Sequence, residues 1–126
     1  MDVLGQRLSR DVLAGVMIAR LEAMLLDAAR ERRMMTYREV ARGLEIKPPH
    51  TIHKAALLIE ALMRCHAEAG VPQLTSLVIS RVRGGLPAPG YFLLLHELNL
   101  FDGDGEGEVA RTYHENEVHR CFDANG

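Results

Sequence analysis

Two pairs of side chains in this sequence are of types that can perform catalysis or bind a metal. In neither pair does the spacing suit that chemistry. Cys65 and His66 are a nucleophile and a base, which must lie within hydrogen-bond reach to act together. Adjacent residues on a helix point in different directions, so this pair does not meet that requirement. His114 and His119 are five residues apart and share a helix face poorly, which argues against a zinc site. We therefore predict no catalytic residue, no metal site and no cofactor, in a protein that is not an enzyme.

An acidic stretch from Asp102 to Glu108 follows part of a calcium-loop pattern. It has carboxylates at loop positions one, three and five and glycine at position six, and Val109 is the aliphatic residue at position eight. Position twelve should be a bidentate glutamate, but it is Tyr113, and Glu115 comes two residues late. Without that ligand calcium would bind weakly or not at all. A flexible acidic linker is therefore the favoured interpretation.

A pair of helices is the clearest structural unit that could position a site. Thr36 and Glu39 form a capping-box pattern, in which each side chain satisfies a backbone amide of the other residue, so a short helix should begin there. The prolines Pro48–Pro49 prevent this helix from continuing. A second helix is predicted over residues 51–69, because its apolar residues recur at intervals of three and four and Gly70 is a good C-cap.

After this helix pair the pattern changes to that of a strand. Residues 74–82 are rich in β-branched side chains and bounded by turn formers, so we predict one strand over this range. The pair Gly84–Gly85 supplies a turn, and two prolines exclude a central strand for residues 86–90. A short helix, a longer helix, a strand and a loop are the parts of a winged helix built on a helix-turn-helix.

Further helices are predicted on both sides of this unit. Residues 8–33 carry an apolar stripe that could pack on the helix at 51–69 or pair with a second chain. Residues 91–101 favour a buried helix, and residues 108–122 favour a last helix. The predicted fold class is mainly α with a small β element. We expect one domain with three parts, namely the N-terminal helix (8–33), a winged-helix-like core (36–92) and a C-terminal helical extension with an acidic loop (93–126).

Composition and charge limit the function classes. The chain has 126 residues, which suits one domain, and a net charge of -2. Residues 1–96 carry +4 and residues 97–126 carry -6, so a mildly basic body is followed by an acidic tail that would oppose binding to phosphates. The two cysteines favour a reducing cytoplasm. No apolar run is long enough to span a membrane, so no membrane association is expected.

One stretch resembles a known family. Thr36–Ala41 reads TYREVA and is similar to the TYGE(I/V)A opening of the DNA-binding domain of alkylguanine-DNA alkyltransferases and alkyltransferase-like proteins. In that family there follow a helix that enters the minor groove, a strand, a P-C-H-R-V motif with the alkyl-accepting cysteine, and a glycine-rich turn ending in G-Y. This chain has the same order of parts over about residues 36–92, including Gly84–Gly85 and Gly90–Tyr91. Small helix–strand modules found beside restriction-type nucleases have a similar glycine–proline loop.

The chain also departs from that family. Val78–Arg81 reads VISR where the family has P-C-H-R, so the acceptor cysteine is missing. The second helix is longer here, and the family's intercalating arginine would fall near His53 or Lys54. The resemblance therefore implies a DNA-binding fold without alkyl transfer.

Two functions from different classes follow from the sequence. The first is a non-enzymatic DNA-binding protein of winged-helix type, regulatory or accessory to DNA repair or restriction. It predicts contacts to double-stranded DNA from Tyr37, Arg38, Arg42, His53, Lys54, Arg81 and Arg83. The second is a protein-interaction or assembly module that forms a homodimer through its N-terminal helix and docks a partner on its acidic tail. Convergence of the basic residues on one face favours DNA, and their scatter favours the interaction module.

Overall fold

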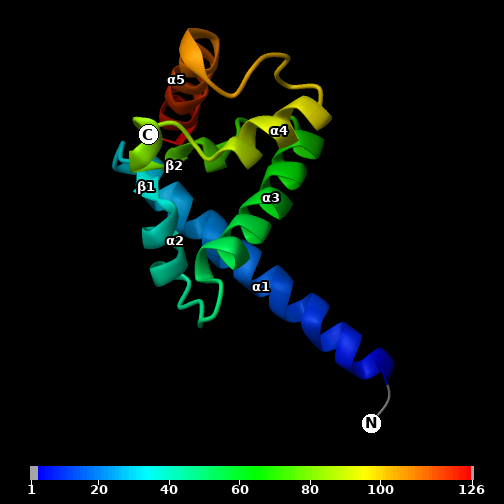
Figure 1. Cartoon of the computed structure of the whole chain (residues 1–126). Helices are drawn as coiled ribbons and strands as arrows, with labels where there is room; N and C mark the ends of the chain where they lie inside the picture. The colour runs from blue at the N-terminus through cyan, green and yellow to red at the C-terminus, as the bar shows by residue number, and fades with distance from the viewer. Residues whose placement is uncertain (1–2, 126) are drawn as a thin grey trace.

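The fold is mainly α with one small sheet, which confirms the predicted class. The computed structural model describes the backbone of residues 3–125 and the side chains of residues 12–125. In Figure 1, α4 and α5 lie at the end of the molecule away from the start of α1, and α2 and α3 lie beside the C-terminal half of α1. The elements in chain order are α1 (Val3–Arg30), β1 (Met35–Thr36), α2 (Tyr37–Gly43), α3 (Thr51–Ala69), η1 (Leu74–Leu77, a 3-10 helix), β2 (Val78–Ile79), η2 (Arg81–Arg83, a 3-10 helix), α4 (Pro89–Glu97) and α5 (Gly107–Asn125).

The short helix α2 begins at the predicted capping box. The Glu39 amide donates to the Thr36 hydroxyl and the Thr36 amide donates to the Glu39 carboxylate, both at 3.1 Å. The hydrogen bond from the Thr36 amide is the largest of several contacts that lower the pKa of Glu39, because it stabilises the carboxylate. Val40 and Ala41 are buried and hold α2 in place beside α3.

The longer helix α3 has the predicted boundaries. It begins at Thr51 and ends at Ala69, and Gly70 caps it with a φ of +68°, a left-handed conformation that suits glycine. It packs against α1 and α2. Its buried apolar face consists of Ala55, Ile59, Leu62 and Met63.

The N-terminal helix differs from the prediction at both ends. It spans Val3–Arg30, whereas the apolar stripe predicted residues 8–33. It stops early because Arg32 has a φ of +52° and the Arg33 amide donates back to the Ala28 carbonyl at 3.0 Å. This backbone geometry is a helix C-cap formed without glycine, which periodicity alone does not reveal.

The predicted strand over residues 74–82 is wrong for most of its length. Strand pairing is limited to Val78 and Ile79, which pair in parallel with Met35 and Thr36 of β1. No other strand lies beside them among residues 3–125, so the rest of the segment has no ladder to join. β-propensity reflects packing on a pleated surface, and without that surface it does not decide the conformation.

The segment forms 3-10 turns, and other elements satisfy several of its buried polar groups. The Gln73 amide donates to the Glu117 carboxylate of α5 at 2.9 Å, and the Gln73 side-chain amide donates to the Met63 carbonyl of α3 at 3.0 Å. Nε2 of His114 lies 2.7 Å from the Ser76 carbonyl, and burial lowers the pKa of His114, so a neutral ring that donates through Nε2 fits this contact. η1 is fully buried and contacts α1, α3 and α5, so it lies at the centre of the core.

Both C-terminal helices are present, but the first spans Pro89–Glu97 where residues 91–101 were predicted, so it starts within the predicted loop 86–90 and ends four residues early. α4 starts at Pro89, in the first turn where proline is tolerated, and Asn99 with a φ of +60° follows its end. α5 spans Gly107–Asn125, and the acidic loop connects the two helices. Among the described residues, the longest helices are all too polar to cross a membrane.

Candidate nucleic-acid interface

A groove lies where α2, α3 and the β2–η2 segment meet. Its volume is about 680 Å³. β1 and β2 bring the start of α2 next to Ile79, because their register pairs Thr36 with Ile79. The helix pair, the small sheet and the segment after β2 all contribute to its lining. The lining residues are Thr36, Tyr37, Arg38, Glu39, Arg42, Ile52, Ala56, Ile79, Ser80, Arg81, Val82 and Ala88.

Three of the predicted DNA-contacting arginines line this groove. Arg38 and Arg42 are four residues apart and therefore share one face of α2, and Arg81 comes from η2. All three side chains are exposed. Within residues 12–125, none of the three guanidinium groups has a hydrogen-bond or ion-pair partner. The structure thus brings together cations from two elements that the sequence separates by about forty residues.

The groove carries more positive than negative charge. Glu39 is the single acidic residue in the lining, against three arginines. Its carboxylate is already held by the Thr36 amide, and Arg81 and Arg33 also lower its pKa. The lining has a formal excess of two positive charges, although the whole chain is at -2. An anion would therefore meet a local field opposite in sign to that of the protein as a whole.

Tyr37 lines the groove but has a structural contact. Its phenolic oxygen accepts a hydrogen bond at 2.9 Å from the Ala88 amide, which precedes α4. Burial raises the pKa of Tyr37, so the phenol stays protonated. Its O–H remains a donor after it accepts this bond. Tyr37 therefore ties the start of α2 to the chain that leads into α4, and both Tyr37 and Ala88 line the groove.

The other three predicted contact residues do not line this groove. The Lys54 ammonium donates to the Lys47 carbonyl at 3.0 Å, which ties α3 to the loop before it. His53 is exposed on α3, next to Ile52, whose side chain does line the groove. Arg83 points the opposite way, toward the acidic loop: its guanidinium donates to the Pro87 carbonyl at 2.8 Å and to the Gly105 carbonyl at 2.5 Å. The geometry thus separates His53, Lys54 and Arg83 from the groove arginines.

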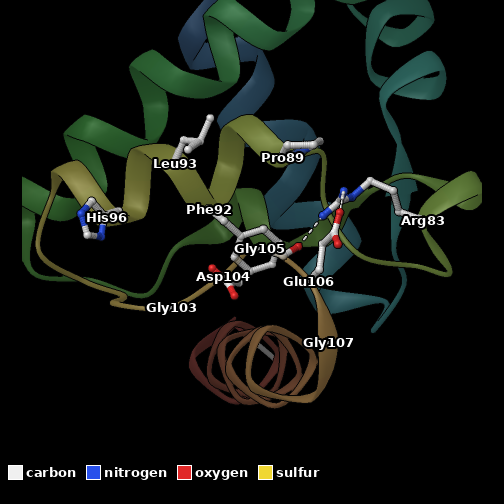
Figure 2. A pocket seen from close by; sticks show the side chains of 10 residues that line it. All are labelled: Arg83, Pro89, Phe92, Leu93, His96, Gly103, Asp104, Gly105, Glu106 and Gly107. Carbon is white, nitrogen blue, oxygen red and sulfur yellow. Dashed lines mark hydrogen bonds and ion pairs between the residues drawn. The ribbon is translucent and has the colours of Figure 1, made fainter.

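Figure 2 shows the concave surface to which Arg83 contributes. Its volume is about 590 Å³, and Phe92 and Leu93 of α4 form its apolar side. Asp104 and Glu106 lie on the opposite side, and Glu106 is 4.0 Å from the Arg83 guanidinium. The acidic residues of this surface make it unsuited to a phosphate backbone.

The groups considered for chemistry are kept apart. Cys65 is exposed, whereas His66 is buried and its Nε2 is 2.7 Å from the Glu22 carboxylate of α1. Cys121 is buried, and desolvation raises its pKa to about 12, so it stays a thiol. Over the described part of the chain, no three side chains of histidine, cysteine, aspartate or glutamate are placed to hold a metal ion.

Two groove residues were missed from the sequence. Ile52 is 44% exposed and Val82 is 96% exposed, although the first belongs to an apolar helix stripe and the second to a predicted strand. Neither residue is among the predicted contact residues, because apolar side chains are usually buried. The sequence signal that could have singled out Val82 is its position between two arginines and before two glycines.

Comparisons with known proteins give no match to a protein-family model, to a curated protein or to a solved structure.

Proposed function

We propose that this protein is non-enzymatic and binds double-stranded DNA. The phosphate backbone would be bound in the groove between α2, α3 and η2. The observation that carries the proposal is the convergence of Arg38, Arg42 and Arg81, all exposed and unpaired within residues 12–125. Arginine presents its donors in a planar fork that matches phosphate oxygens, and free guanidinium groups lose no existing partner on binding.

The arrangement suits backbone contacts better than base reading. Arg38 and Arg42 lie on one face of a short helix and Arg81 comes from a separate element, so a phosphate strand in the groove would meet cations from two elements. Contacts of this kind fix the position of a protein on a duplex and carry no sequence information by themselves. A role as a regulatory or accessory protein in DNA repair or restriction would need further contacts for specificity.

The family resemblance supports the same proposal. It covers the residues that build the groove, from TYREVA in β1 and α2 to the glycine-rich turn after η2. Ile79 stands in place of the acceptor cysteine and lines the groove. An aliphatic side chain has no nucleophile, so binding without alkyl transfer is the activity we propose. A cytoplasmic location would suit such a protein, and the two free cysteines fit the reducing conditions there.

Removing the three groove arginines should weaken DNA binding and its salt dependence. The test is fluorescence anisotropy of a labelled mixed-sequence duplex of about 20 base pairs at roughly 50 to 200 mM salt. We expect the Arg38→Ala/Arg42→Ala/Arg81→Ala variant to bind roughly 10- to 100-fold more weakly. The slope of log affinity against log salt should fall by about 2 to 3, because each lost phosphate contact removes about 0.9.

A matched variant controls for the loss of net charge. Arg30→Ala/Arg32→Ala/Arg64→Ala removes the same charge from exposed arginines outside the groove, each of which has an acidic partner. Its affinity should stay within about threefold of the wild type, because none of these three side chains lines the groove that is proposed to hold the phosphates. Equal losses in both variants, or no binding of the wild type at micromolar protein and low salt, would refute the proposed interface.

A second candidate function, assembly through α1, is favoured by one specific observation. The N-terminal half of α1 extends beyond the other elements (Figure 1), and its side chains Val12, Leu13 and Val16 are 66%, 62% and 50% exposed. Val12 and Val16 are one turn apart, and Leu13 widens the stripe. A second copy of the chain could cover this stripe with the same stripe of its own, as in a symmetric dimer.

The oligomeric state tests this candidate directly. Light scattering after gel filtration should give a mass of about twice 14.0 kDa for the wild type. Leu13→Glu should give a monomer, because it places a charge in the shared stripe. Leu93→Glu alters a side chain that is 68% exposed on α4, and it should leave the dimer intact. A monomeric wild type at micromolar concentration would exclude the symmetric dimer.

A further inference from the structure

Val82 is the most exposed large apolar side chain among residues 12–125, at 96%. It sits in the middle of η2, between Arg81 and Arg83. A single exposed apolar residue is ordinary on a protein surface and needs no explanation by itself. What sets Val82 apart is the way in which the chain on both sides of it is held and the charge around it.

The loop that carries Val82 is closed by its own backbone. The Ser80 amide donates to the Leu86 carbonyl at 2.8 Å, and the Gly85 amide donates to the Ser80 carbonyl at 3.1 Å. Gly84 and Gly85 have φ values of +67° and +90°, which only glycine adopts without strain. The tip from Arg81 to Arg83 is therefore a short turn on a closed base.

Two arginines fix this loop to the rest of the molecule. Arg83 reaches the Pro87 and Gly105 carbonyls, and Figure 2 shows its side chain directed at Gly105 and Glu106 of the acidic loop. Arg111 of α5 donates to the Gly84 carbonyl at 3.3 Å. Because its two flanks are fixed in this way, Val82 is presented outward in one geometry before any ligand arrives, which limits the entropy that binding would cost.

The surroundings of Val82 show which ligand it fits. It forms part of the groove lining, next to Arg81 in sequence and together with Arg38 and Arg42. The valine side chain makes no favourable polar contact with water or with phosphates. It can, however, fill the space between two base pairs that have been partly unstacked. Proteins that bend DNA combine an apolar wedge with cations that neutralise the flanking phosphates.

We propose that Val82 is a wedge that enters a base step from the minor groove and kinks the duplex while Arg38, Arg42 and Arg81 hold the phosphates. This proposal rests on the proposed DNA-binding function and deepens it. Pyrimidine–purine steps such as TA unstack at the lowest cost, so sites with a central TA step should be preferred. Sequence specificity would then come from the deformability of the DNA at that step. The phosphate contacts alone do not provide such specificity.

The experiment uses the full chain and a duplex with 2-aminopurine at a central TA step. Its fluorescence rises when the base unstacks, and donor and acceptor dyes at the two ends report bending. At saturating wild-type protein we expect a rise in both signals. Val82→Ser should weaken binding by roughly three- to tenfold, and at saturation it should lose most of both signals. Val82→Leu should keep them, because the larger side chain still fills the step.

The controls separate this proposal from the proposed function. Val109→Ser changes a valine that is 65% exposed on α5, and it should leave both signals at the wild-type level. If the wild type binds without unstacking or bending, or if Val82→Ser gives full signals, the wedge is refuted and DNA binding stands. If the wild type does not bind DNA at low salt, the DNA-binding function and the wedge both fail.

Discussion

Replacing Leu77 with alanine is expected to lower the free energy of unfolding by about 3 to 5 kcal/mol. The Leu77 side chain is 0% exposed, and its element η1 contacts α1, α3 and α5. Truncation would open a cavity where three helices meet, and none of them can move in to fill it without losing its other contacts. The total free energy of unfolding of a small domain is only about 5 to 15 kcal/mol, so this loss is large. Urea-induced unfolding followed by circular dichroism measures it.

Two further variants show whether the effect belongs to the centre of the core. Leu93→Ala removes the same atoms from a side chain that is 68% exposed on α4, and it should change stability by less than about 0.5 kcal/mol. Leu77→Met keeps most of the volume and should cost less than about 1.5 kcal/mol. A cost below about 1 kcal/mol for Leu77→Ala would mean that the three helices do not depend on η1 for their packing.

Helix ends with local signals were predictable from the sequence. The capping box needs only Thr36 and Glu39, three residues apart, and both of its hydrogen bonds are present. The end of α3 needs only Gly70, whose positive φ is a property of that residue type. The end of α1 was not predictable, because Arg32 adopts a positive φ that its residue type does not favour.

The segment from Leu74 to Val82 shows where local reasoning stops. Its β-branched residues would suit a strand, but a strand exists only where another strand pairs with it. The available partner is Met35–Thr36, so just Val78 and Ile79 join the sheet. The rest is shaped by Glu117, which is 44 residues away from Gln73 along the chain. Contacts between residues so far apart in the chain produce no recognisable pattern in a short stretch of the sequence.

The candidate site was predictable in part for the same reason. Arg38 and Arg42 share a helix face by their spacing alone, and the groove contains both. Arg83 was expected at the same surface, but the Gly105 carbonyl, 22 residues away, takes its guanidinium. Lys54 is likewise taken up by the Lys47 carbonyl. Whether an arginine or lysine side chain is available to a ligand depends on such carbonyls, and charge counting does not detect them.

Fewer basic residues therefore converge than the DNA hypothesis predicts, and those that do converge lie in a single groove. Three cations remain in one groove, while the acidic tail keeps the whole chain at -2. Such a protein should not bind polyanions over its whole surface. Binding would depend on the groove and on the apolar tip at Val82, so few substitutions should be enough to abolish it.

Replacing Glu117 with alanine is expected to lower the free energy of unfolding by about 2 to 3 kcal/mol. Its side chain is 5% exposed, and its carboxylate accepts from the Gln73 amide at 2.9 Å and from the Arg120 guanidinium. Removal leaves the Gln73 amide as a buried donor without an acceptor, and this desolvated group is the main source of the cost. The Arg120 side chain is 58% exposed, so water can solvate it once the pair is broken. Urea unfolding gives the loss.

The conservative variants decide which property of Glu117 matters. Glu117→Gln keeps an acceptor oxygen for the Gln73 amide and should recover at least half of the lost stability, whereas Glu115→Ala, an exposed neighbour, should have little effect. If Glu117→Gln is as costly as Glu117→Ala, the charge and not the hydrogen bond holds the segment. Hydrogen exchange adds a local readout, because the Ser76 amide donates to the Gln73 carbonyl at 2.9 Å. Its protection should fall in Glu117→Ala, since Gln73 anchors the chain that leads through η1 and β2 to Arg81.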